Sequence, residues 1–445
     1  MGTKGGMVMI QITGGTVITM DPAYRVVQAD VWIDESYIVH IGPWEKTADV
    51  VIQAQNQYVL PGLVQPHVHL CQTLFRGMGD DLDLLDWLKT RIWPLEAAHD
   101  FDSVHVSAQL GIAELLRSGT TTILDMETVS HTEGAFHALA QSGIRAIAGK
   151  CLMDEPHPLL YEPTESALKE SLDLAAAWHG FDRGRIQYGL APRFALSVTD
   201  DLWRLVAEEA GRRHLIVHTH VAESQREVQE ILAHKGLLPM HHLHAMGLTR
   251  GRLMAAHGVW LTKDELTIVR DYQVGLVHCP SSNLKLASGV APISTWQEQG
   301  ISFGISADGA PCNNRLDGFE EMRLAALLQK PLFGAKSMLA RTTLTQATFG
   351  GAKILGLDDR IGSIEVGKEA DLIMVSQKGV HHQPMVYSDP YSQIVYQARS
   401  DDVSMTMVAG RVLYQDDRLL TLDEERVIGQ AEKAIRRVAD RANIL

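Results

Sequence analysis

"PGLVQPHVHLCQTLFRG", residues Pro61–Gly77, separates two parts of the chain that have different sequence patterns. Before it, from Val8 to Leu60, short alternating apolar and polar stretches predict strands joined by Gly turns. After Gly62, apolar strands alternate with helical segments, the order expected of a parallel sheet with crossover helices. Alternate residues of a strand point to one face, so His67 and His69 would direct two imidazoles at the same point. That point is either a metal ion or a packed interior.

Eight apolar stretches follow one another in the second part of the chain and predict strands. They lie at residues 62–70, 120–126, 145–153, 185–192, 214–220, 252–257, 273–279 and 301–309. Helical patterns separate them, among them 102–119, 165–180, 199–213 and 224–236, and several end in Gly as a C-cap would. Eight strand and helix units in series predict an α/β fold, a (β/α)8 TIM-type barrel, with its chemistry at the C-terminal ends of the strands.

The last part of the chain, after two predicted helices, again has the pattern of strands. Residues 318–330 and 341–356 predict helices, 362–375 and 403–417 predict strands, and 422–442 predicts an amphipathic helix. We expect both termini to pair into one small β-sandwich domain. The expected parts are residues 1–60 and 361–445 for that domain, the latter including the terminal helix, and 61–360 for the barrel.

Composition limits the classes of function. Of 445 residues, 45% are hydrophobic and 21% charged, with a net charge of −14 and no Lys/Arg-rich run, which disfavours nucleic acid as a partner. No stretch resembles a membrane span, and the first residues do not resemble a signal peptide, so we expect a cytoplasmic protein that does not bind membranes. Scattered cysteines predict free thiols: Cys71, Cys151, Cys279 and Cys312.

Potential ligands gather at the predicted strand ends. They are His67 and His69 after the first strand, His220 and Glu223 after the fifth, His257 after the sixth, His278 on the seventh and Asp308 after the eighth. Three imidazoles and one carboxylate, from His67, His69, His220 and Asp308, would form a first shell for one Zn²⁺ or Fe²⁺ ion. Glu223 and His257 would then move protons.

Other readings of single residues stay open. Glu223 could instead be an acid near the N-terminus of the helix predicted at 224–236. His218 lies one layer deeper than His220 and is expected to be a core histidine. The clusters "MHHLHAM" (240–246) and "VHHQP" (380–384) are expected to be surface loops.

Several motifs occur together in the order in which one family carries them. They are "PGLVQPHVHL", "HTHVAES", "MAAHGVWL", "VHCPSSNLKLASGVAPI", "SADGAPCNN" and "IGSIEVGKEADLIMV". The sequence thereby resembles the amidohydrolase superfamily, in the branch of methylthioadenosine, S-adenosylhomocysteine and 5′-deoxyadenosine deaminases, guanine deaminases and s-triazine hydrolases. The resemblance implies a one-metal hydrolytic deaminase of a small molecule, with Glu223 shuttling protons and His257 and Asp308 contacting the hydrolytic water. Arg193 stands where binuclear members carry a lysine, which favours a single ion.

The resemblance gives conflicting indications of substrate. Glu96 matches a residue that contacts ribose hydroxyls in methylthioadenosine-type enzymes, with Trp87, Trp93 and Leu85 as an apolar wall, or Trp93 as a packed junction. Gln72, Arg193 and Phe194 match residues that hold the base in guanine deaminases. An adenosine-type nucleoside is therefore the first expectation, and guanine, a related purine or pterin base, or an s-triazine the alternative.

Two further residues are expected near the substrate, and two other classes of protein are considered as alternatives. His278 is expected in the substrate site, and Cys312 favours displacement of an amine over chloride in a triazine-like substrate. A scaffold that has lost activity is opposed by the full ligand set, and a cyclic amide hydrolase by the missing lysine. Similar proteins also imply a homo-oligomer.

Overall fold

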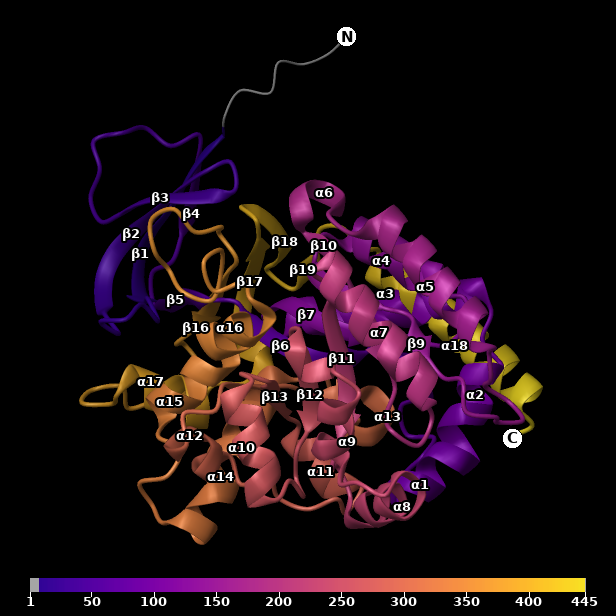
Figure 1. Cartoon of the computed structure of the whole chain (residues 1–445). Helices are drawn as coiled ribbons and strands as arrows, with labels where there is room; N and C mark the ends of the chain where they lie inside the picture. The colour runs from indigo at the N-terminus through magenta and orange to yellow at the C-terminus, as the bar shows by residue number, and fades with distance from the viewer. Residues whose placement is uncertain (1–7, 445) are drawn as a thin grey trace.

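The computed structural model describes residues 8–444, so residues 1–7 of the expected N-terminal part lie outside the described residues. Figure 1 shows a barrel ringed by helices, with a second sheet beside it that contains strands from both ends of the chain. Among residues 8–444, no helix has the length and apolar run needed to cross a bilayer.

The predicted barrel is confirmed. Its strands are β6 (Leu63–His69), β7 (Thr120–Met126), β8 (Arg145–Gly149), β9 (Cys151–Leu152), β10 (Ile186–Pro192), β11 (Ile216–Val221), β12 (Leu253–His257), β13 (Gly275–His278), β14 (Phe303–Ile305) and β15 (Asp308–Gly309). The third predicted strand is split at Lys150 into β8 and β9, and the eighth is split into β14 and β15. β14 pairs with β13 and β15 pairs with β6, both in parallel, so the two pieces of the eighth strand close the barrel.

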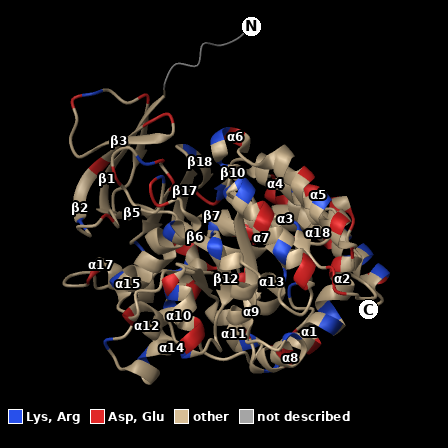
Figure 2. Cartoon of the chain, viewed as in Figure 1, with Lys and Arg blue, Asp and Glu red and all other residues tan. Residues whose placement is uncertain are grey.

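Helices cover the outside of the barrel where the sequence places them. They include α3 (Phe101–Arg117), α4 (Glu133–Ser142), α5 (Thr164–Trp178), α7 (Asp200–Arg213), α8 (Gln225–Lys235), α10 (Lys263–Asp271), α12 (Ile293–Glu298) and α14 (Gly318–Phe333). Ser224 and Glu227 form a capping box at the start of α8, and Gly236 ends it with a φ of 71°. Most barrel strands carry no Lys, Arg, Asp or Glu, and Figure 2 shows these residues mainly on the surrounding helices and loops.

The second sheet joins the two ends of the chain. It runs in the order β19-β18-β17-β16-β5-β1-β2-β3, and β4 pairs with β1. The strands are β1 (Met9–Ile18), β2 (Val26–Asp34), β3 (Tyr37–Ile41), β4 (Val50–Gln53), β5 (Gln57–Pro61), β16 (Leu372–Ser376), β17 (Val403–Val408), β18 (Arg411–Gln415) and β19 (Arg418–Leu419). β16 pairs antiparallel with β5, from Leu372 opposite Pro61 to Ser376 opposite Gln57. On this basis we propose the domain limits expected from the sequence, except that the terminal helix lies on the barrel.

Buried charges tie this sheet to the barrel. Arg145, at the start of β8, donates from Nε to Asp371 Oδ2 at 2.7 Å and from Nη2 to Glu369 Oε2 at 2.6 Å. The terminal helix α18 (Glu424–Ala442) returns to the barrel, where Arg441 pairs with Asp100, the N-cap of α3, at 2.7 Å. The helix therefore belongs to the barrel surface by its contacts, although it follows the second sheet in sequence.

Three local expectations were wrong. The strand expected over 362–375 begins only at Leu372, because turns precede it and Gly367 adopts a φ of 95°. The "MHHLHAM" cluster lies largely in the helix α9 (Pro239–Ala245), where His242 is buried. The "VHHQP" cluster includes a 3-10 turn, η5 (Val380–His382), where His382 is buried. Their place outside the predicted strand ends indicates surface loops, whereas the rings of His242 and His382 are buried.

Candidate functional site

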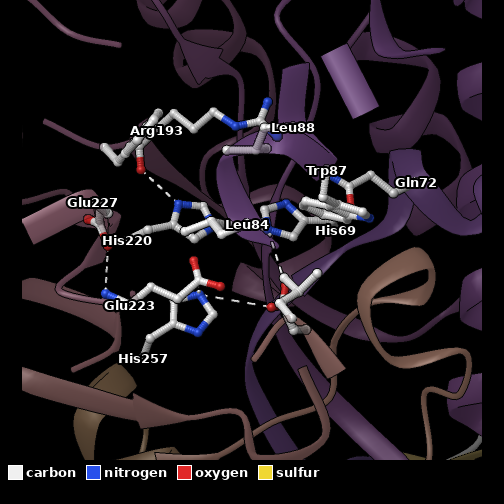
Figure 3. A pocket seen from close by; sticks show the side chains of 13 residues that line it. His69, Gln72, Leu84, Trp87, Leu88, Arg193, His220, Glu223, Glu227 and His257 are labelled. Carbon is white, nitrogen blue, oxygen red and sulfur yellow. Dashed lines mark hydrogen bonds and ion pairs between the residues drawn. The ribbon is translucent and has the colours of Figure 1, made fainter. Parts of the chain in front are cut away.

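The C-terminal ends of the barrel strands bring the expected ligands together. His67 and His69 end β6, His220 lies near the end of β11, and Asp308 begins β15. Asp308 Oδ1 lies 3.2 Å from His67 Nε2 and 3.4 Å from His69 Nε2. His69 Nε2 and His220 Nε2 are 3.1 Å apart, and Figure 3 shows their rings facing each other across the pocket.

The hydrogen bonds behind these rings leave lone pairs that face one another. His69 Nδ1 donates to the carbonyl of Met126 at 2.8 Å, and His220 Nδ1 donates to the carbonyl of Arg193 at 2.7 Å. A carbonyl only accepts, so in each neutral ring the proton lies on Nδ1 and Nε2 carries a lone pair. Burial lowers the pKa of His69 to about 3 and that of His220 well below its ordinary value, so both rings are neutral. A cation held by the two Nε2 atoms would relieve this repulsion.

His67 is held from behind by a further histidine. His67 Nδ1 lies 2.6 Å from His218 Nε2, and both rings are buried. His67 Nε2, on the side of Asp308, has no hydrogen-bond partner among the described residues. A buried ring nitrogen without a partner is unfavourable unless a ligand reaches it. The donor set of three imidazoles and one carboxylate oxygen therefore fits a divalent metal ion, and His218 lies in the position of an outer partner that orients a ligand.

A second group of side chains faces this donor set. His257 Nδ1 lies 2.9 Å from Asn283 Oδ1, and His257 Nε2 lies 3.4 Å from Glu223 Oε2 and 3.9 Å from Asp308 Oδ2. Ser282 Oγ donates to the same Asp308 oxygen at 2.7 Å. Burial raises the pKa of Glu223 well above its ordinary value, and the charge of Asp308 adds to the rise. A neutral Glu223 carboxyl can donate a proton into the pocket.

Glu223 is not needed as a helix cap. The side chain of Ser224 caps α8, and Glu227 accepts from the backbone N–H groups of Glu223 and Ser224 at 2.7 and 3.1 Å. His257 and Asp308 adopt left-handed backbone conformations, with φ of 73° and 67°. Such conformations are unfavourable for residues other than Gly and cluster at functional sites. The chain therefore maintains strained backbone at two residues of this group.

The pocket in front of these residues has an apolar wall. Leu84, Trp87, Leu88, Phe194 and Leu286 form the wall, while Gln72, Arg193, Glu223 and Glu227 supply polar groups beside the histidines (Figure 3). This mixture of apolar and polar lining residues is typical of small-molecule sites.

Glu96 and Arg193, which indicate different substrates in the sequence, bind each other. Arg193 Nη1 donates to Glu96 Oε2 at 2.6 Å, and Nη2 donates to Oε1 at 3.1 Å. Gln72 Nε2 donates to Glu96 Oε1 at 2.7 Å. Glu96 is 3% exposed and Arg193 is 4% exposed, so the pair is fully desolvated. The backbone carbonyl of Arg193 also accepts from the backbone N–H of His220 at 3.0 Å, besides its bond to the ring.

The structure places three expected substrate residues away from this pocket. His278 is buried beside α12, with its ring centroid 6.4 Å from that of Trp296, while the next residue, Cys279, faces His257 and Asp308. Trp93 contacts His157 at 4.5 Å between ring centroids, and with Leu85 lines a neighbouring groove. Cys312 is buried and donates from Sγ to the carbonyl of Gly309 at 3.0 Å.

Sequence reasoning assigned no role to Asn283, and it treated His218 as a core residue. Asn283 lies two residues before the end of the short helix α11 (Pro280–Lys285). It is part of the motif "SSNLKLASG", and that motif is the feature of the sequence that could have indicated its role. His218 stands two residues before His220 on β11, so the strand period alone placed both on one face.

Comparisons with known proteins agree with this architecture. Residues 58–413 match the amidohydrolase family. The chain is 38% identical to a 5′-deoxyadenosine deaminase of Methanobrevibacter smithii, over 93% of this chain and 94% of that protein. It is 36% identical to a 5-methylthioadenosine/S-adenosylhomocysteine deaminase of Moorella thermoacetica, over 90% and 93% of the two chains. A zinc-bound adenosine deaminase from Xanthomonas campestris superposes with a TM-score of 0.91 at 33% identity, covering 97% and 98%. The chain belongs to the amidohydrolase family.

Proposed function

We propose that the protein is a metal-dependent hydrolytic deaminase of an amino-substituted N-heteroaromatic ring, with an adenosine-type nucleoside as its substrate. The observation that carries the proposal is the arrangement of Glu223, His257 and Asp308 around one face of the histidine cluster. These groups can deliver and accept protons on two sides of a ring carbon. The relatives named above are deaminases of 5′-deoxyadenosine and of methylthioadenosine and S-adenosylhomocysteine.

His67, His69, His220 and Asp308 would hold the metal ion, and we propose zinc. Its contribution is Lewis acidity, which makes water acidic enough to serve as a nucleophile near neutral pH. Arg193 occupies the place of the lysine that a two-metal site requires, and its guanidinium is bound to Glu96. These residues therefore support a site for one ion.

The chain's own side chains would carry the protons of the reaction. Glu223 protonates the ring nitrogen beside the amino-bearing carbon, which prepares that carbon for attack. His257, fixed by Asn283, orients the attacking water, and Asp308 accepts its proton and passes it to the departing amine. A C–O bond forms and a C–N bond breaks, and the hydroxyl on the ring carbon returns its proton to Glu223, so the products are ammonia and an oxo-substituted ring.

The substrate ring would lie against the apolar wall, with its substituents toward Gln72 and the Glu96–Arg193 pair. Glu96 Oε1 accepts two hydrogen bonds and Oε2 accepts one, so Oε2 keeps a free lone pair, and Arg193 keeps further N–H groups beyond the two that it gives to Glu96. The pair can thus accept from ribose hydroxyls through Glu96 or donate to a purine carbonyl through Arg193. Guanine remains the second candidate for this reason. Cys312 is not among the residues that line the pocket, so the indication from Cys312 that an amine rather than chloride is displaced loses its support.

Ammonia release from the zinc-loaded protein tests the proposal. We expect turnover of 5′-deoxyadenosine, methylthioadenosine or S-adenosylhomocysteine, weaker turnover of guanine and melamine, and none with Glu223→Gln. Guanine as the best substrate would reverse the order of the two candidates, and turnover of none of them would refute the proposed reaction. A homo-oligomer, which similar proteins imply, is a separate proposal that light scattering tests.

A further inference from the structure

The connection between β16 and β17 brings two adjacent histidines onto one aspartate. His381 and His382 end the turn η5, and Asp402 ends the turn η7 (Ser400–Asp402), directly before β17. His381 Nε2 lies 2.8 Å from Asp402 Oδ2, and His382 Nε2 lies 3.2 Å from the same oxygen. None of the three lines the pocket described above. Two imidazoles and a carboxylate thus converge at the base of a long excursion of the chain.

His382 is not satisfied by this arrangement. It is 1% exposed, and neither of its ring nitrogens makes a hydrogen bond within residues 8–444, because the 3.2 Å approach to Asp402 lacks suitable geometry. A buried imidazole without partners is unfavourable.

The donor set selects a class of ligand. Two imidazole nitrogens and one carboxylate oxygen suit Zn²⁺ and its neighbours Co²⁺, Ni²⁺ and Cu²⁺, whereas Ca²⁺ and Mg²⁺ prefer oxygen ligands alone. Ligands about 2.0 to 2.2 Å from a tetrahedral Zn²⁺ lie about 3.3 Å from one another. The 2.8 and 3.2 Å separations are close to that value, and the three ligand atoms lie within 4.8 Å of one another. The His381 side chain is 24% exposed, which leaves a route for the ion and a place for water.

We propose that His381, His382 and Asp402 form a second, structural site for a divalent transition metal ion, with zinc as the first candidate. The ion would hold together the two ends of the segment 377–402. This segment carries α17 (Pro390–Ser392) and the turn η6 (Gln393–Gln397), whose buried Tyr391, Ile394 and Val395 pack on one face of the second sheet. An ion that bridges the two ends of this long segment closes it into a loop. Such closure stabilises the folded protein, because it restricts the conformations that the unfolded segment can adopt.

Metal counting on the whole enzyme tests the site. Protein equilibrated with excess Zn²⁺ and freed of unbound ion should contain two equivalents per chain by inductively coupled plasma mass spectrometry. His381→Ala and Asp402→Asn should each contain one equivalent, keep ammonia release, and unfold at a lower temperature than the wild type. His137→Ala is the matched control, since the exposed His137 also approaches a carboxylate, that of Glu133 at 3.8 Å, without a third ligand; it should keep two equivalents.

Each other outcome overturns the proposal. One equivalent in the wild type that His381→Ala retains would make the cluster an ordinary hydrogen-bonded group. Two equivalents in His381→Ala would place the extra ion elsewhere. Loss of ammonia release together with the ion would show that the ion came from the first site. Because the count does not depend on turnover, it stands apart from the proposed deaminase activity.

Discussion

The Glu96–Arg193 pair allows a quantitative test of the pocket's construction. Glu96→Gln preserves the shape of the side chain but removes its charge, which leaves the buried guanidinium of Arg193 without a counter-ion. Breaking a buried ion pair by removing one partner destabilises proteins by about 3 to 5 kcal/mol. Because the pair is bidentate and both members are almost fully buried, we expect Glu96→Gln to lower the free energy of unfolding by an amount within that range.

A double-mutant cycle separates the pair from its two members. Arg193→Met should also destabilise, because it leaves the Glu96 carboxylate with only the amide of Gln72. The double variant removes both charges, and replacing a whole buried pair by neutral groups of similar volume is often close to neutral. We therefore expect the double variant to be more stable than the sum of the single losses predicts, with a coupling energy of about 2 to 3 kcal/mol.

Urea unfolding of the four proteins at one zinc concentration measures these differences. Activity adds a second reading: with a nucleoside substrate, Glu96→Gln should lower kcat/KM about a hundredfold, since hydrogen bonds to a charged group contribute roughly 1.5 to 3 kcal/mol each. Arg193→Met should lower guanine turnover more than nucleoside turnover. Single variants within about 1 kcal/mol of the wild type, with additive losses in the double variant, would refute the view that the two side chains act as one unit.

Three further perturbations follow from the geometry. Glu223→Gln should keep the metal content but lower kcat by several orders of magnitude, because the amide cannot transfer a proton; near-normal turnover in a steady-state assay would remove Glu223 from the mechanism. His218→Ala should weaken zinc binding about 10- to 100-fold by freeing His67 Nδ1, as competition with a chromophoric chelator measures, and an unchanged affinity would contradict the role of His218. Burial raises the pKa of Glu321 from 4.5 to about 8, so the folded protein keeps a proton that the unfolded chain releases in that window. The contribution of Glu321 should lower stability by about 1.4 kcal/mol per unit as pH rises through this window, and the pH slope of urea unfolding should be shallower by that amount in Glu321→Gln.

The parts of the fold that repeat a local pattern could be predicted from the sequence. Strand and helix periods placed the barrel strands within a few residues, and the His-Val-His stretch on β6 had to direct His67 and His69 to one side. The convergence of these residues with His220 and Asp308 also followed, because parallel strands of a barrel end at one face.

The errors arose where position depends on partners far apart in the chain or on irregular turns. A π-helical turn, η2 (Leu88–Ile92), lies between Trp87 and Trp93 and turns Trp93 toward His157, and no residue pattern signals such a turn. His278 ends its strand on the side opposite to Cys279, which a one-residue shift in register decides. The partnership of Glu96 with Arg193 joins different parts of the barrel rim, so only the folded chain reveals it.

At position 193, the backbone and the side chain have different roles, so a substitution of the side chain affects only one of them. Its carbonyl oxygen holds the imidazole of His220, and every amino acid has that oxygen, while its guanidinium shapes the wall that a substrate meets. Exchange of the side chain during evolution would therefore change what the pocket accepts and leave the ligand's anchor in place. A substitution at this position would keep the anchor of the metal ligand, but it would leave Glu96 without its partner unless position 96 changed as well. Relatives that share the barrel and its ligands, yet act on different ring compounds, would be expected to diverge here first.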